Sequence, residues 1–159
     1  IDCPPNKMYL TQAMLRACSY FLTVTIPDKI SVYGMPRLLK WVKEIPKHEK
    51  PYLLGCVLNA VNRAGGYEYG TINQQQATEE LYKSIRDQLE PVERKIIDNK
   101  PVLAHVPRLD VISRFLSQGA NKSAWYELRH TGSDQQSVSE IMMNLINRIT
   151  KRIEEYAKI

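Results

Sequence analysis

Three polar or backbone-fixing residues that could contact a ligand each come directly after apolar sequence. Asp2 follows Ile1 and precedes a double proline, and a carboxylate there could hold magnesium through water or position an attacking water. Asn59 follows the apolar residues 52–58, and its amide offers a donor and an acceptor to the edge of a base. Pro107 follows residues 102–106 and fixes the backbone, so that its neighbours can present carbonyls and amides.

Each polar group also has a structural interpretation. Asp2 could cap the helix that follows it, because Asp is a common cap residue. The pair Pro4-Pro5 favours the functional interpretation, since it stiffens the turn. Asn59 could cap a turn leading into residues 62–66, which are typical of a loop. On the residues alone, we favour this turn for Asn59.

The elements that would position these groups alternate between strand and helix. Residues 20–26, 52–58 and 102–106 are short, apolar and rich in β-branched residues, which predicts buried strands. Helices are expected over residues 8–18, from a cap at Ser31 to a stop at Pro46, and over about 73–89. A capping box from Ser137 to Glu140 opens a final helix over about 138–157, whose apolar stripe is typical of core packing. This alternation predicts an α/β fold with a parallel sheet flanked by helices.

Composition indicates one soluble globular domain over residues 1–159. The chain is 43% hydrophobic and 25% charged, and no stretch approaches the roughly 20 apolar residues of a membrane span. Its three cysteines lack CxxC spacing, which favours reduced thiols in a cytosolic protein over a metal site. A net charge of +5 is compatible with nucleic-acid binding. The lysines at 40, 43, 47 and 50 are typical of a solvated helix end, which is the interpretation we favour for that cluster.

Taken in order, these motifs resemble the ParA/MinD group of deviant P-loop ATPases. Ile1 to Pro5, with Leu10 to Met14 after it, resembles the second acidic motif of that group, hydrophobic-Asp-x-Pro-Pro. Residues 26–34 resemble the segment that follows the second switch, 55–59 the hydrophobic-Asn signature, and 105–113 the hydrophobic-Pro-Arg segment. The resemblance extends from residue 1 to about 118.

The resemblance implies roles for individual residues. Asp2 would be catalytic and would hold magnesium through water, within the second switch segment. Asn59 would recognise adenine, and Pro107 and Arg108 would lie in the loop that packs on the purine. Many relatives carry Asn or Asp where this chain has Leu109, so its adenine contacts differ from theirs in detail.

For the intact protein, the resemblance implies the carboxyl-terminal half of a three-layer P-loop fold. Such a protein binds ATP and magnesium, dimerises over the nucleotides and is stimulated by a centromere-binding ParB-like partner. It partitions plasmids or chromosomes, and it is cytoplasmic and nucleoid-associated with no membrane partner. In its ATP-bound state it binds DNA non-specifically. By charge and by their place in the carboxyl half, the DNA-binding candidates are Arg63, Lys100, Arg108, Arg114 and Lys122.

The sequence also departs from this family. It contains no GxxxxGK loop, whose amides and lysine would bind the phosphates, so we expect the chain alone to be inactive and to be part of a longer protein. The alternative is a non-catalytic, truncated or degenerate module that acts through protein–protein contacts. Between residues 118 and 136 the resemblance fades. The aromatic and basic residues from Trp125 to His130 are typical either of a nucleic-acid surface or of a plug at the sheet edge.

Overall fold

The computed structural model describes residues 9–62, 71–97, 100–107 and 138–159. Along the chain the elements are α1 (Tyr9–Ala17), β1 (Tyr20–Thr25), α2 (Lys29–Lys43), β2 (Tyr52–Val61), α3 (Ile72–Gln88), α4 (Pro91–Ile97), β3 (Val102–Pro107) and α7 (Val138–Tyr156). The expected strands and long helices are all present within about three residues of their predicted bounds.

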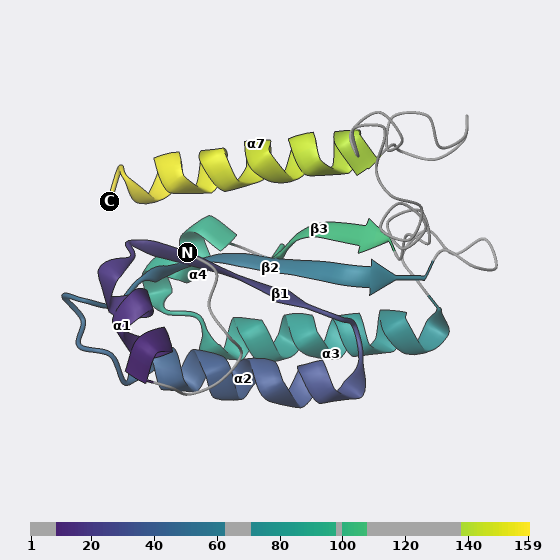
Figure 1. The fold of residues 1–159 in the computed structure, drawn as a ribbon, viewed down its shortest axis with the longest axis horizontal. Helices are drawn as coiled ribbons and strands as arrows, with labels where there is room; N and C mark the ends of the chain where they lie inside the picture. Colours follow the sequence, from purple (N-terminus) through teal and green to yellow (C-terminus); the bar gives the residue numbers. More distant parts are fainter. Residues whose placement is uncertain (1–8, 63–70, 98–99, 108–137) are drawn as a thin grey trace, which may run out of the picture.

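Within the described residues, three strands form one parallel sheet in the order β1-β2-β3. Helix α2 connects β1 to β2, and helices α3 and α4 connect β2 to β3 (Figure 1). The predicted α/β class with a parallel sheet flanked by helices is therefore confirmed.

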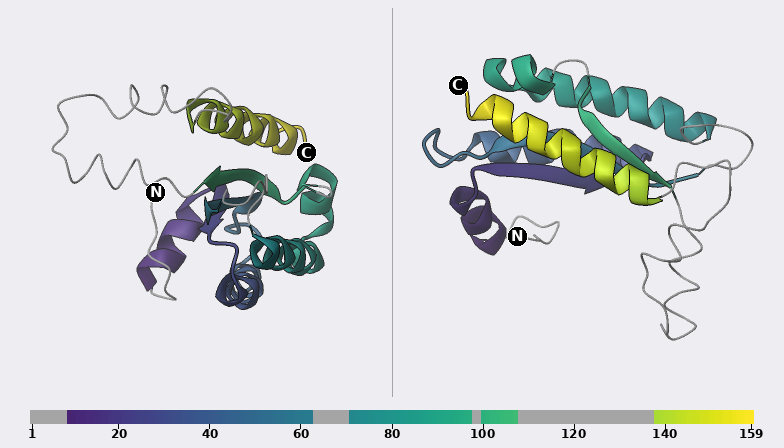
Figure 2. Two further views of the ribbon diagram at one scale, coloured as in Figure 1. Left: turned by 90° about the vertical axis from the view of Figure 1, so that its right-hand side faces the viewer. Right: turned by 90° about the horizontal axis from the view of Figure 1, so that it is seen from above.

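Helices lie on both faces of the sheet, which gives three layers (Figure 2). Helices α2 and α3 pack on one face, where their apolar stripes meet the side chains of β2 around Leu58, Leu81 and Ile85, each fully buried. Helix α7 covers the other face over β2 and β3, and Ile141 contacts Val57 and Leu103 there. Parallel strands need cover on both faces because both of their side-chain rows are apolar.

The helix starts differ from the expected ones in two places. Asp28, not Ser31, caps α2, because its Oδ1 accepts a hydrogen bond from the Ser31 amide at 2.8 Å. Helix α3 begins with a capping box in which Thr71 and Gln74 each bind the backbone amide of the other. Ser137, the expected cap of α7, lies outside the described residues.

The amino end of β2 is fixed by side chains from two helices. Glu93 of α4 accepts the Leu53 amide through Oε1 at 3.0 Å, and the Tyr156 hydroxyl of α7 donates to the Leu53 carbonyl at 2.8 Å. The Arg152 guanidinium of α7 donates to the Leu54 carbonyl and to the Lys100 carbonyl. These bonds attach both helices, α4 and α7, to the central strand β2.

Candidate functional site

The carboxyl ends of β2 and β3 bring Asn59 and Pro107 to the same edge of the sheet. Leu58 pairs with His105 and Val61 pairs with Pro107, so Asn59 lies in the irregular stretch between these two pairs. The same edge carries the turn after β1, where Asp28 caps α2. The carboxyl edge of an open parallel sheet is where such folds bind ligands.

Asn59 is exposed, and its side chain is held by its own neighbour. Its Oδ1 accepts a hydrogen bond from the Ala60 amide at 2.9 Å. Ala60 has a φ of 54°, the left-handed conformation that residues with a Cβ adopt only at a cost. A bond to the next residue's amide is typical of the turn interpretation of Asn59. It also identifies which end of the amide group carries the oxygen, because the Ala60 N–H needs an acceptor.

Gln74 holds the backbone that follows Asn59. Its Oε1 accepts hydrogen bonds from the Asn62 amide at 3.0 Å and the Thr71 amide at 3.2 Å. Its Nε2 donates to the Ala60 carbonyl at 3.3 Å. One side chain therefore ties the first turn of α3 to the end of β2.

Sequence reasoning missed Gln74 as a site residue. The signal available was its place at the third position of a helix after Thr71, which is typical of a capping box. Nothing in that pattern indicates the additional bonds to Ala60 and Asn62, which lie 14 and 12 residues away in sequence.

His105 lies one strand away from Asn59 and is half-buried. Burial lowers the pKa of its imidazole, and the positive charge of Arg148 lowers this pKa further. The ring is therefore neutral at neutral pH.

Most of the other predicted site residues lie outside the described residues. They are Asp2, Arg63, Arg108, Arg114 and Lys122. Lys100 is described and exposed, and it precedes β3 at the amino edge of the sheet, opposite Asn59. The structure therefore brings together Asn59 and Pro107 and separates Lys100 from them.

Metal ligation is expected of Asp2, which is not among the described residues. Within 9–62, 71–97, 100–107 and 138–159, no three His, Cys, Asp or Glu side chains are grouped so that they could hold an ion. A magnesium site therefore stays an expectation that rests on Asp2.

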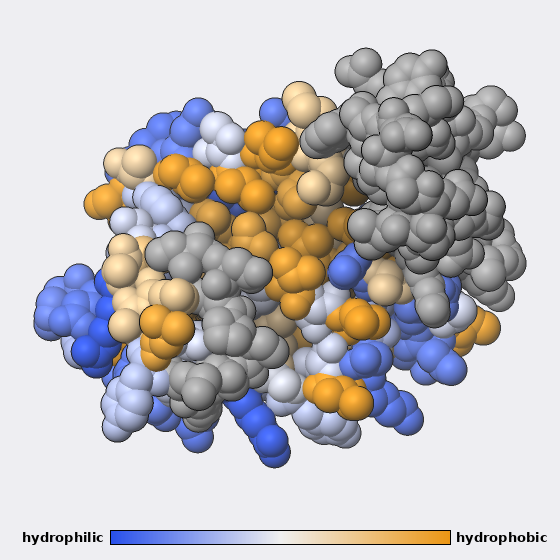
Figure 3. Space-filling model, in the orientation of Figure 1, coloured by the Kyte–Doolittle hydropathy of each residue, from blue (hydrophilic) through white to orange (hydrophobic). Residues whose placement is uncertain are grey.

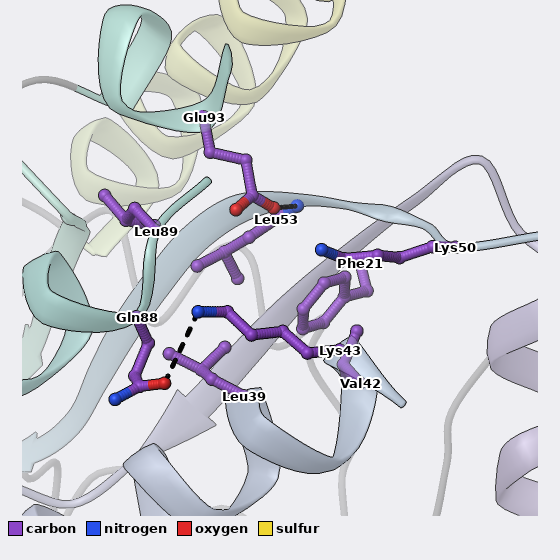
Figure 4. A pocket seen from close by; sticks show the side chains of 9 residues that line it. All are labelled: Phe21, Leu39, Val42, Lys43, Lys50, Leu53, Gln88, Leu89 and Glu93. Atoms are coloured by element: carbon purple, nitrogen blue, oxygen red, sulfur yellow. Dashed lines mark hydrogen bonds between the residues drawn. The ribbon is translucent and has the colours of Figure 1, made fainter. Parts of the chain in front are cut away.

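A small hollow lies at the opposite end of the sheet, between α2, the end of α3 and the start of β2 (Figure 4). It encloses about 10 Å³, which is room for one water molecule and too little for a base. Lys43 reaches Gln88 across it, with Nζ 3.5 Å from Oε1. Its lining residues are Phe21, Leu39, Val42, Lys43, Lys50, Leu53, Gln88, Leu89 and Glu93.

The lysines near this hollow surround a carboxylate. Lys50 pairs with Glu90 at 3.1 Å. Hydrogen bonding and charge from Lys50 lower the pKa of the Glu90 carboxyl, with smaller contributions from the charges of Lys43 and Lys47. The positive charge of these lysines is thus partly neutralised by Glu90, which is compatible with a solvated helix end.

The chain matches no protein-family model, no curated protein and no solved structure. Among the described helices, none combines the length and the apolar character needed to cross a membrane.

Proposed function

We propose that this chain supplies the base-binding part of a ParA-like partitioning ATPase. The observation that carries the proposal is the placement of Asn59 and Pro107 at the carboxyl ends of two adjacent parallel strands. The resemblance assigns both positions to purine binding. Asn59 and Pro107 are 48 positions apart in sequence, and the parallel pairing of β2 with β3 places both residues at the same edge of the sheet.

In this proposal the chain's residues bind and orient the adenine. Asn59 would contact the edge of the base, and the backbone at Pro107 would lie beside it. Asp2 would hold magnesium through water and position the attacking water near the phosphates, which the missing GxxxxGK loop would bind. The intact protein would dimerise on ATP, bind DNA non-specifically in the nucleoid, and respond to a ParB-like partner.

The surface of β1 supports the idea that further elements of the same sheet exist. Leu22 and Val24 on this edge strand are 38% and 63% exposed, and Ile26 directly after it is 47% exposed. Figure 3 shows apolar surface between β1 and α7. On α7, Ile146 is 52% exposed. Edge strands in proteins are usually protected by charges or proline, and the residues of β1 itself include neither.

The same surface favours a second candidate, a non-catalytic module that binds a protein partner through β1 and α7. Large exposed apolar patches commonly mark such contacts. The two candidates differ in what covers Val24. In the ATPase, the complete gene product buries Val24 within its own sheet, whereas in the module Val24 stays accessible until the partner binds.

Nucleotide and DNA binding test the first candidate. The complete gene product should bind ATP, and its DNA binding should require ATP and weaken steeply with salt. DNA binding that ignores nucleotide would count against a partitioning ATPase. The 159-residue chain alone should not bind ATP tightly, since it lacks the phosphate loop, and a submicromolar affinity would contradict this.

A cysteine at position 24 separates the two candidates directly. Val24→Cys should resist thiol-reactive reagents in the complete gene product if β1 is an interior strand. Thr150→Cys on the exposed side of α7 is the matched control and should react. Rapid labelling at position 24 would favour the module.

A further inference from the structure

The Asn59 amide has a defined orientation. The Ala60 N–H, 2.9 Å from Oδ1, requires an acceptor at that end of the side chain, so Nδ2 is placed at the other end. An amide fixed in this way presents one donor and one acceptor in a set order. The Asn59 side chain can therefore pair better with one purine base than with another.

Such an order discriminates between purine bases. Adenine presents a donor and an acceptor side by side at N6 and N7, which match the two ends of an Asn amide. Guanine presents acceptors at O6 and N7, so one of them would face Oδ1. If the Asn59 amide could rotate freely, it could turn its donor toward either base and would lose much of this preference.

The Ala60 amide can hold the Asn59 side chain in this orientation only because the backbone of Ala60 is itself held in place. A φ of 54° is unfavourable for alanine. Gln74 offsets that cost, since its Nε2 binds the Ala60 carbonyl at 3.3 Å and its Oε1 binds the Asn62 amide at 3.0 Å. Gln74 thus holds the backbone on the carboxyl side of the left-handed residue.

We propose that Gln74 is a positioning residue that sets adenine over guanine selectivity at Asn59. Gln74 acts through the backbone of Ala60, whose carbonyl it binds, and does not contact the base itself. The inference rests on the proposed function, because it assumes that Asn59 contacts the base.

The test compares ATP and GTP affinity in the complete gene product, using slowly hydrolysed analogues of both nucleotides and titration calorimetry. The wild-type protein should prefer ATP. Gln74→Ala should lower the ATP-to-GTP affinity ratio by about five- to tenfold, the value expected for one lost hydrogen bond. Gln76→Ala, an exposed neighbour on the same helix, is the matched control and should leave the ratio unchanged.

Gln74→Glu separates positioning from folding. Its carboxylate can still accept the Asn62 and Thr71 amides and favours the amino end of α3, but it cannot donate to the Ala60 carbonyl. We expect slow hydrogen exchange at the Asn62 amide, as in the wild-type protein, together with a reduced ATP-to-GTP ratio.

Three results would overturn the inference. An unchanged ratio in both Gln74 variants would show that Gln74 only stabilises the fold. An equal loss in Gln76→Ala would show that the effect is not specific to the Ala60 bond. A wild-type protein that binds neither nucleotide would overturn the proposed function as well, and this last result is recognised before any variant is made.

Discussion

The guanidinium of Arg152 on α7 lies in the space that a side chain at Gly55 on β2 would occupy. Gly55 has a φ of 134°, and a Cβ added there would lie 2.7 Å from the Pro101 carbonyl oxygen as well as against Arg152. The missing side chain lets the guanidinium reach the carbonyls of Leu54 and Lys100. Central strand, neighbouring strand and final helix therefore meet at one glycine.

Gly55→Ala should destabilise the protein by about 3 kcal/mol, because it combines an unfavourable backbone conformation with a clash in the core. The matched control is Gly34→Ala within α2, where an added Cβ meets nothing within 4 Å. That change should stabilise the protein by about 0.5–1 kcal/mol, since alanine favours helix. Urea unfolding measures both, and similar small effects would contradict the account of Gly55.

The carboxylate of Glu93 should contribute strongly to the stability of the fold through the backbone amides that it accepts. It is 5% exposed, and its two oxygens accept the Leu53 amide at 3.0 Å and the Glu90 amide at 2.9 Å. Glu93→Ala would leave both amides without this acceptor and should cost about 3 kcal/mol in unfolding free energy. Glu93→Gln retains one oxygen and should cost less.

The control for this prediction is Glu90→Ala, which removes the partly exposed ion pair to Lys50. Surface ion pairs contribute about 0–1 kcal/mol, so this variant should unfold close to the wild-type protein. An equal loss for Glu90→Ala and Glu93→Ala would show that charge, not amide capping, stabilises this corner.

Stability should fall at alkaline pH through Cys56. Burial raises the pKa of this thiol from 9.0 to about 11, although a hydrogen bond with Thr23 opposes the shift. The folded state holds the proton more tightly than the unfolded state, so the contribution is complete below pH 9 and is lost as pH rises toward 11. A shift of this size corresponds to a loss of about 3 kcal/mol.

Cys56→Ala removes this titration. Unfolding free energies measured from pH 8 to pH 11 should fall less steeply for the variant than for the wild-type protein. Parallel curves would show that the thiol does not titrate with unfolding. The hydroxyl of Tyr156, whose pKa burial also raises, should give both proteins a shared decline at still higher pH.

Local patterns were enough to predict the sheet. The β-branched runs identified all three strands that the structure describes, and their alternation with helices implied a parallel arrangement. Pro107 is the last residue of β3, next to its predicted end at residue 106, whereas β2 continues past Asn59 to Val61, three residues beyond its predicted end. The seven-residue α4, from Pro91 to Ile97, was missed because it lacks a full amphipathic repeat.

Contacts made at long range could not be predicted in this way. The Gln74 bond to Ala60 depends on a left-handed alanine that no local preference indicates. Nothing in the local sequence indicates that Arg152 is buried, yet it is only 9% exposed, and its guanidinium donates to the carbonyls of Leu54 and Lys100. Its position follows from the absent side chain at Gly55, 97 residues earlier in the chain.

The central claim is that Asn59 recognises the base of a bound nucleotide, and Asn59→Ala in the complete gene product tests it most directly. Asn147→Ala on the exposed side of α7 serves as the control. We predict that Asn59→Ala weakens ATP binding about tenfold, with little effect on GTP binding, while Asn147→Ala binds ATP as the wild-type protein does. Unchanged ATP affinity in Asn59→Ala would contradict the claim.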